Sequence, residues 1–218
     1  MIPLIPRGKT GILFDLDGTL IYSSKCHKDA FLCAAAESGV TLDAGFYETV
    51  AGMTTESAAE VLGIAPERRS AFVDRKRSAY IERVVNGDVP EIPGATALLR
   101  TALDLGWQVA LVTSASANSA HAIVDNMGWG SYFQTIVTGD DVIQGKPSPE
   151  PFLLAIEILG LGIDACIGVE DSEAGLAALS RANIVAIRVN HSTSLALTTS
   201  TLSEVLLALS SYETRADE

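Results

Sequence analysis

Five short runs of apolar residues along the chain each have the length of a buried strand. The runs are continuous rather than alternating, which is typical of strands in a parallel sheet that is covered on both faces. Segments with helical spacing separate the last four runs, and alternating strands and helices indicate an α/β fold. We therefore expect a doubly wound parallel sheet with strands at Ile12–Phe14, Val109–Thr113, Thr135–Thr138, Cys166–Glu170 and Val185–Val189.

Two of the expected helices carry recognisable end signals. Residues 152–159 place apolar side chains on one helical face, and Gly160 stands where such a helix would end. Thr201 and Glu204 have the spacing of a capping box, so the last helix is expected to begin there.

The alternation of strands and helices is interrupted between the first two strands. Residues 22–92 hold three helical patterns and no convincing strand pattern. Two of these helices are expected to end at Gly39 and Gly63, and the third covers 71–85. We expect an inserted helical cap over residues 22–92, with residues 1–21 and 93–218 forming the α/β catalytic core.

Asp15-Leu16-Asp17-Gly18-Thr19 directly follows the first expected strand. Aspartates are rarely buried without a partner, and neighbouring carboxylates repel each other. A divalent cation would stabilise both carboxylates. The pattern predicts that one aspartate attacks phosphorus, that the other moves a proton, and that Mg²⁺ holds the pair.

Polar residues also follow the later strands. Each segment alone has an ordinary explanation, as a helix N-cap or an exposed turn. Together they fall at the carboxyl end of one parallel sheet, which is where ligands bind in open α/β folds. The segments are Thr113-Ser114, Gly139-Asp140-Asp141, Gly145-Lys146-Pro147-Ser148-Pro149 and Glu170-Asp171-Ser172.

The composition limits the possible partners and location. The net charge of −12 argues against nucleic acid or an anionic membrane as a partner, so we expect a small phosphorylated substrate. Three scattered cysteines without a CxxC pair suggest neither a zinc site nor a disulfide framework. We expect a cytoplasmic protein without a signal peptide or membrane span, as a monomer or weak dimer.

These motifs, in this order, resemble those of the haloacid dehalogenase superfamily, in the variant with a helical cap between the first two motifs. That group includes sugar-phosphate phosphatases and β-phosphoglucomutase. The resemblance implies that Asp15 is the nucleophile and Asp17 the general acid and base. It implies that Lys146 and either Thr113 or Ser114 bind phosphate. It further implies a Mg²⁺ ion held by Asp15, the Asp17 backbone carbonyl, Glu170 and Asp171.

Further positions could contact the substrate. His27 matches a position near the cap hinge where relatives often carry histidine, although a helix-surface histidine is an equal alternative. Ser116 and Asn118 match the place where β-phosphoglucomutase binds a second phosphate. The intervening lysine of that enzyme is Ala117 here, so a simple polar helix start is favoured. In the cap, Thr54, Thr55 and Glu56 occupy the loop expected to meet the substrate.

The function expected from the sequence is Mg²⁺-dependent hydrolysis of a small sugar or polyol phosphate through an aspartyl-phosphate. A phosphomutase is the first alternative. It is disfavoured because the cap loop at 52–56 contains no Lys or Arg to hold a second phosphate. A non-catalytic binding or regulatory module is the other alternative, and the presence of every catalytic residue argues against it.

Overall fold

The computed structural model describes residues 5, 8–42, 45–50, 53–189 and 201–211. The chain forms two compact units. The sheet unit comprises Met1–Tyr22 and Pro90–Glu218, and the helical unit comprises Ser23–Val89. Within the described ranges, no helix combines the length and the apolar character needed to cross a bilayer.

The sheet unit is built on five parallel strands in the order β3-β2-β1-β4-β5. The central strand β1 is entirely buried, because it has a neighbouring strand on each side and helices above and below. The predicted α/β fold with a parallel sheet is therefore confirmed. The strands are β1 (Gly11–Phe14), β2 (Gln108–Val112), β3 (Thr135–Val137), β4 (Cys166–Glu170) and β5 (Val185–Arg188).

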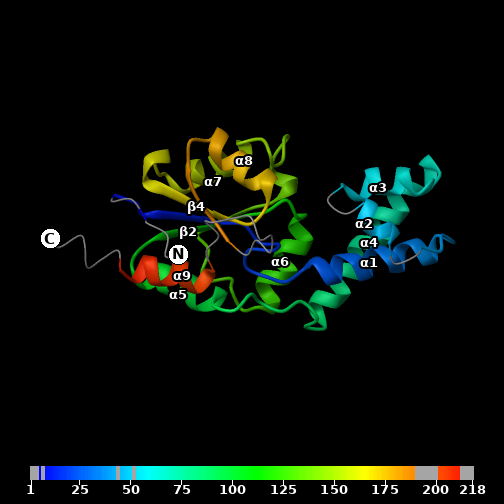
Figure 1. The fold of residues 1–218 in the computed structure, drawn as a ribbon, viewed down its shortest axis with the longest axis horizontal. Helices are drawn as coiled ribbons and strands as arrows, with labels where there is room; N and C mark the ends of the chain where they lie inside the picture. Colours follow the sequence, from blue (N-terminus) through cyan, green and yellow to red (C-terminus); the bar gives the residue numbers. More distant parts are fainter. Residues whose placement is uncertain (1–4, 6–7, 43–44, 51–52, 190–200, 212–218) are drawn as a thin grey trace. The chain divides into compact units, whose positions relative to one another are not determined.

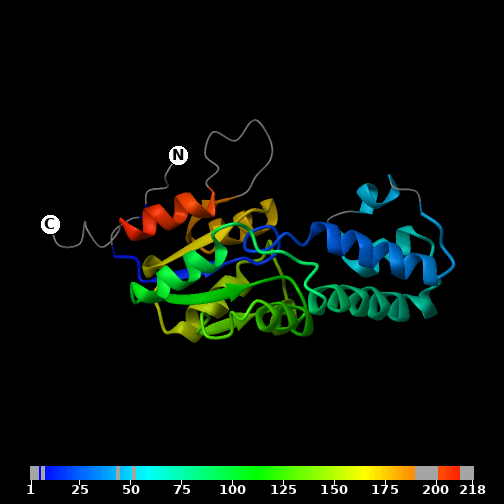
Figure 2. The ribbon, with the colours of Figure 1, turned by 90° about the horizontal axis from the view of Figure 1, so that it is seen from below.

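Helices cover both faces of this sheet. One face carries α7 and α8, and α9 lies beside α5 on the opposite face (Figure 1, Figure 2). The end signals of two helices hold in the structure: Gly160 ends α7 with a φ of 66°, and Thr201 and Glu204 form the capping box of α9. The helices are α5 (Ala95–Asp104), α6 (Ala117–Asn126), α7 (Glu150–Leu159), α8 (Glu173–Arg181) and α9 (Leu202–Ser210), with short 3-10 helices η1 (Gly139–Asp141) and η2 (Ile163–Ala165).

The helical unit has its own apolar core, in which Phe31, Val50, Ile64 and Phe72 are buried together. Its longest helix begins five residues before the predicted start, because Pro66 occupies a first-turn position where no backbone N–H is needed. A short helix, α2, was not apparent from the sequence. The helices are α1 (Ser24–Glu37), α2 (Phe46–Val50), α3 (Thr55–Val61) and α4 (Pro66–Val85).

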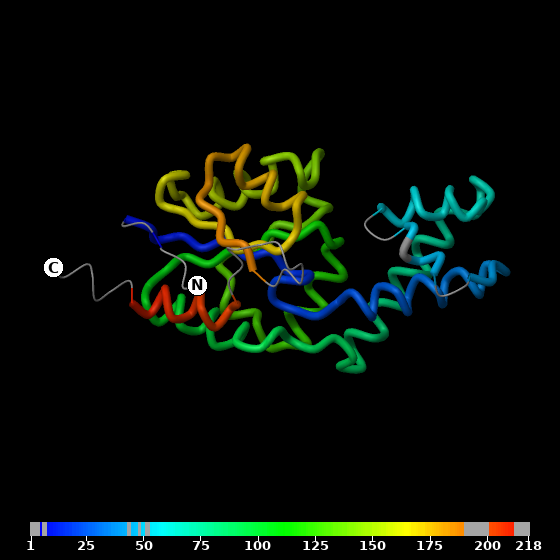
Figure 3. Tube along the Cα trace, viewed as in Figure 1, coloured from blue at the N-terminus to red at the C-terminus, as the bar shows by residue number. Residues whose placement is uncertain are grey.

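The chain leaves and re-enters the sheet unit through two segments that lie side by side (Figure 3). Ile21 and Glu91 form an antiparallel bridge. The backbone N–H of Tyr22 donates to the Pro90 carbonyl, and that of Ile92 donates to the Leu20 carbonyl, at 2.9 and 2.8 Å. These bonds fix both ends of the insertion at one point beside the end of β1.

Candidate active site

Lys146 lies at the centre of a buried charged cluster at the carboxyl end of the sheet. Its Nζ donates to Asp15 Oδ1 at 2.6 Å, to Glu170 Oε1 at 2.8 Å and to the Val112 carbonyl at 2.9 Å. These acceptors follow or end the neighbouring strands β1, β4 and β2. An ammonium group has three N–H donors, so the three bonds fully determine its position.

Burial controls the charge of this cluster. Desolvation raises the pKa of Asp15 to about 8, against the lowering effect of Lys146, and the neighbouring Glu170 raises it further. Desolvation alone would lower the pKa of Lys146, but Asp15 and Glu170 outweigh it and raise that pKa. Lys146 therefore carries a fixed positive charge, while Asp15 carries its negative charge at a cost in free energy.

Glu170 is completely buried at the end of β4 and uses both carboxylate oxygens. Oε1 accepts from Lys146, and Oε2 accepts from the backbone N–H and the hydroxyl of Ser172, at 2.7 and 2.9 Å. Ser172 Oγ in turn accepts from the Gly175 N–H and caps α8. Glu170 thus joins the lysine to the start of the next helix.

Asp171 is held beside the first motif by a contact that the sequence did not reveal. Thr19 donates its hydroxyl to Asp171 Oδ1 at 3.2 Å. Gly18 has a φ of 87°, and a Cβ there would overlap the carboxylate of Asp171, so only glycine fits. Desolvation raises the pKa of Asp171 to about 6, and the charge of Glu170 adds to this effect.

Asp15, Glu170 and Asp171 can each offer an oxygen within 4.8 Å of the others. One ammonium group does not neutralise three carboxylates. The pKa values of Asp15 and Asp171 are raised chiefly by desolvation and further by the charge of Glu170, so both carboxylates lack full compensation. Carboxylate oxygens are also the ligands that Mg²⁺ prefers. These residues therefore fit a divalent cation. The Asp17 side chain is not part of this group of carboxylates, and the metal role expected for its backbone carbonyl stays a prediction.

The two candidate phosphate-binding hydroxyls differ in their environment. Thr113 is buried just beyond β2, and its Oγ1 accepts from the Ala115 backbone N–H at 3.0 Å. That bond uses the oxygen as an acceptor and leaves the hydroxyl hydrogen available to a ligand. Ser114 is exposed. Both residues lie beside the cluster through Val112, whose carbonyl binds Lys146, and both phosphate-binding roles stay predictions.

Ser116 and Asn118 lie at the start of α6. Ser116 is the N-cap residue, but its hydroxyl bonds to the Ser119 hydroxyl at 3.2 Å and makes no capping bond to the helix backbone. Asn118 is exposed in the first turn. A role for either residue in substrate binding stays a prediction.

The other sequence-predicted residues belong to the helical unit. His27 stacks on Tyr80 with ring centroids 4.1 Å apart, and its Nδ1 lies 3.0 Å from Lys76 Nζ. His27 is therefore half-buried between α1 and α4 rather than free on a helix surface. Thr54 caps α3 by accepting from the Ser57 N–H at 3.1 Å, and Thr55 is half-buried in the first turn.

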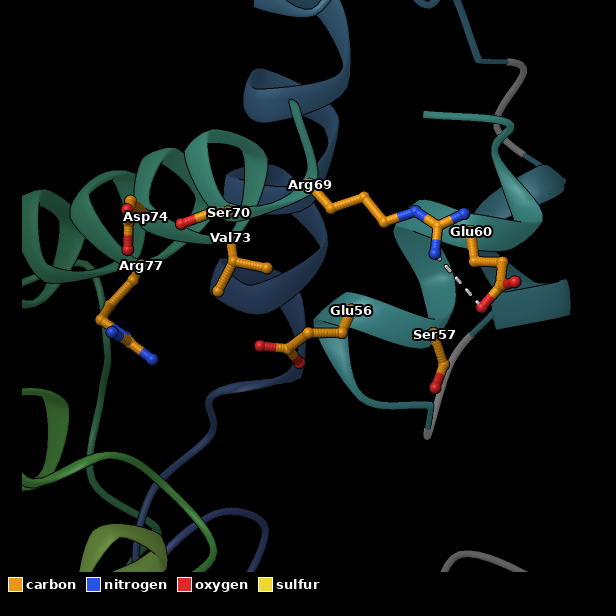
Figure 4. A pocket seen from close by; sticks show the side chains of 8 residues that line it. All are labelled: Glu56, Ser57, Glu60, Arg69, Ser70, Val73, Asp74 and Arg77. Atoms are coloured by element: carbon orange, nitrogen blue, oxygen red, sulfur yellow. Dashed lines mark ion pairs between the residues drawn. The ribbon is translucent and has the colours of Figure 1, made fainter. Parts of the chain in front are cut away.

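Glu56 lines a hollow of about 560 Å³ between α3 and α4 (Figure 4). In this view Glu56 and Arg77 point toward each other across the hollow, while Arg69 is directed at Glu60. The α4 residues share one helical face. Arg77 was not expected at the site, and its four-residue spacing from Arg69 and Val73 is the sequence signal that places it on this face. The remaining lining residues are Ser57, Ser70, Val73 and Asp74.

Comparisons with known proteins agree with this architecture. Hexitol phosphatase A of Escherichia coli K12 is 32% identical over 206 residues, which cover 93% of this chain and 91% of that protein. Protein CbbY of Rhodobacter capsulatus is 32% identical over 185 residues, covering 79% and 82% of the two chains. The crystal structure of CbbY from Rhodobacter sphaeroides in complex with phosphate gives a TM-score of 0.78 at 26% identity, covering 88% and 92%. Residues 12–189 match the haloacid dehalogenase-like hydrolase model, and the chain belongs to that family.

Proposed function

We propose that this chain is a Mg²⁺-dependent phosphatase that hydrolyses a small sugar or polyol phosphate through an aspartyl-phosphate. The observation that carries the proposal is the position of Lys146, bonded to both Asp15 and Glu170 at the carboxyl end of the sheet. A buried cation between two carboxylates supplies the fixed positive charge that a transferring phosphoryl group requires.

In the first step, a carboxylate oxygen of Asp15 attacks phosphorus, and the bond from phosphorus to the leaving oxygen breaks. Asp17 gives its proton to the leaving alcohol. In the second step, Asp17 takes a proton from water, whose oxygen attacks the phosphorus of the aspartyl-phosphate. The bond from phosphorus to the Asp15 oxygen breaks, which releases inorganic phosphate and frees Asp15. Asp17 has regained the proton that it gave up in the first step, so both aspartates return to their starting states.

Asp15, Glu170, Asp171 and the Asp17 carbonyl are the groups that would hold Mg²⁺. The ion would reduce the repulsion between the Asp15 carboxylate and the phosphate oxygens. Lys146 holds Asp15 in place and places its positive charge beside a phosphoryl oxygen. Thr113 or Ser114 donates a hydroxyl to another phosphoryl oxygen, aided by the backbone N–H that follows.

The helical unit supplies specificity for the leaving group in this proposal. Glu56 and Arg77 offer an acceptor and donors, and Ser57 and Ser70 add hydroxyl groups along the same hollow. A polyhydroxylated leaving group can pair with all of these. The relative named hexitol phosphatase A supports a polyol phosphate as the first substrate to test.

The three cysteines are free, which supports a reducing, cytoplasmic location. The excess of acidic residues supports a small substrate bound through a metal ion rather than a nucleic acid or membrane partner. We propose that the protein acts as a monomer or weak dimer.

A phosphate-release screen tests the proposal. The panel comprises hexitol phosphates, hexose phosphates, phosphoglycolate and p-nitrophenyl phosphate, each with Mg²⁺ and with excess EDTA. We expect release that depends on Mg²⁺ and falls at least about a thousandfold in Asp15→Asn, because an amide is a poor nucleophile. The amide of Asp15→Asn retains an oxygen that can accept from Lys146, so the variant should still fold. An unchanged circular dichroism spectrum is the control that separates a loss of chemistry from a loss of structure. Full activity in EDTA, or more than a tenth of the activity in Asp15→Asn, would contradict the mechanism.

A further inference from the structure

The first turn of α6 already carries a negative group supplied by the chain itself. The backbone N–H of Ala117 donates to Asp140 Oδ2 at 2.9 Å. The first turn, Ala117-Asn118-Ser119, contains no basic side chain. A helix N-terminus normally attracts an anion through its free N–H groups and its dipole, and here Asp140 binds the first of those N–H groups.

The backbone around Asp140 fixes this arrangement. The Gly139 N–H donates to the Ala115 carbonyl at 2.8 Å. A Cβ on Gly139 would lie 2.7 Å from the Ser114 carbonyl oxygen, so the loop before η1 packs directly on the loop before α6. Thr138 caps η1 by accepting from the Asp140 N–H. The carboxylate of Asp140 is therefore placed by its neighbours rather than by chance orientation of an exposed side chain.

This position is close to the proposed phosphate site. Ala117 is three positions after Ser114, and an extended chain of that length spans at most about 11 Å. A substrate that places one phosphate near Thr113 or Ser114 and carries a second phosphate nearby would bring that second group toward Asp140. Like charges repel, and the Ala117 N–H, which could have bonded to that second phosphate, is already bonded to Asp140.

We propose that Asp140 makes this enzyme selective for substrates with a single phosphate group, by occupying the anion position at the start of α6. The inference rests on the proposed phosphatase function and adds a specificity determinant to it. Asp140 acts here through its charge and not only through its hydrogen bond.

The test measures inhibition of p-nitrophenyl phosphate hydrolysis by fructose 6-phosphate and by fructose 1,6-bisphosphate. Asp140→Asn keeps an oxygen that can accept from Ala117 and removes the charge. It should lower the inhibition constant of the bisphosphate about five- to tenfold, from the loss of one like-charge repulsion near the surface. The inhibition constant of fructose 6-phosphate should change less than about twofold, within the usual effect of a surface substitution.

Asp125→Asn is the matched control, because it removes the same charge from the other end of α6. It should leave both inhibition constants unchanged. An unchanged inhibition constant for the bisphosphate in Asp140→Asn overturns the inference, as does equal tightening of both sugars. If Asp140→Ala loses turnover but keeps the ratio of the inhibition constants for the bisphosphate and for fructose 6-phosphate, the inference is also wrong. Asp140 would then only position the loop before η1. Absence of p-nitrophenyl phosphate hydrolysis in the unaltered protein would instead contradict the proposed function.

Discussion

Gly175 lies against Glu170 so closely that a Cβ on residue 175 would overlap the carboxylate oxygen Oε1. This is the oxygen that accepts from Lys146. The fully buried Glu170 has no room to move away, because Ser172 holds its other oxygen. Lys146 can therefore keep its position only if residue 175, in the first turn of α8, is glycine.

Gly175→Ala should both destabilise the protein and impair it. Overpacking a buried site costs about 2 kcal/mol, which chemical denaturation would measure. Displacement of Glu170 should also move Lys146 and lower kcat/KM at least about tenfold, since an error of about an ångström in a site is costly. Gly130→Ala is the control, because a Cβ there meets no atom within 4 Å. Similar losses in both variants would mean that the contact with Glu170 is unimportant.

Lys146→Met should destabilise the metal-free protein strongly. Removing one partner of a buried ion pair leaves the other charges uncompensated, at a cost of about 3–5 kcal/mol. Unfolding in EDTA at pH 7.5 would measure it. Lys25→Met removes an ion pair of similar length, Lys25 to Asp29 at 2.7 Å, but the lysine side chain is 85% exposed. The unfolding midpoint should not change in that variant. Equal midpoints for both variants would rule out a buried charge network.

The metal-free protein should lose stability as the pH rises. The folded-state pKa is raised to about 8 for Asp15 and about 6 for Asp171, chiefly by desolvation. A carboxyl group with a raised folded pKa contributes stability that is fully present below its unfolded pKa, near 4, and is lost as the pH rises through the folded value. Thermal unfolding in EDTA should therefore give a Tm that falls between pH 4 and pH 8, and this fall should be smaller in Asp15→Asn.

Mg²⁺ should bind more weakly in acid. Binding requires ionised carboxylates and so releases the protons that Asp15 and Asp171 hold at low pH. Below pH 6, the apparent affinity should fall on the order of tenfold per pH unit for each proton released. Thermal shift against Mg²⁺ concentration at pH 5.5, 6.5 and 7.5 measures this. Asp171→Asn should bind Mg²⁺ more weakly and with a shallower dependence on pH, because only the proton of Asp15 remains to be released. An affinity independent of pH would exclude these carboxylates as ligands.

The helical unit should govern selectivity rather than the chemical step. Glu56→Gln and Arg77→Met remove the facing charges of the hollow, so kcat/KM on the best polyol phosphate should fall about tenfold or more. Hydrolysis of p-nitrophenyl phosphate should change less than about twofold, because its good leaving group needs little assistance. Glu67→Gln, on the same helix as Arg77 but outside the hollow, is the control. Equal losses on both substrates would assign the pair to the catalytic site itself.

Much of the fold follows from local pattern. The continuous apolar runs predicted a parallel sheet, and the structure confirms it. The polar motifs that follow the strands predicted the haloacid dehalogenase family, and the family match confirms that prediction. Parallel strands bring their carboxyl ends to one edge, and for that reason residues as distant as Asp15 and Lys146 could be grouped from the sequence.

Other features depend on packing between distant segments and left no local signal. In the sequence, Thr19 is typical of a turn. Its bond to Asp171 forms only because β1 and β4 pair in the sheet and bring the two residues together. The short helix α2 has five residues, too few for a helical period to stand out. The position of Arg77 in a hollow depends on α3 packing beside α4, because residues of both helices line it.

The adjacent entry and exit of the helical unit bear on how such a protein can change over evolutionary time. Residues 20–22 and 90–92 are hydrogen-bonded neighbours. Any chain inserted between them therefore needs only to have its two ends close together to be compatible with the sheet. Loop-closure entropy grows slowly with length, so a shorter or longer insertion would change the folding free energy of the sheet very little. An ancestor could therefore exchange one recognition module for another while the catalytic framework kept its sequence, and new substrates could be acquired without rebuilding the chemistry.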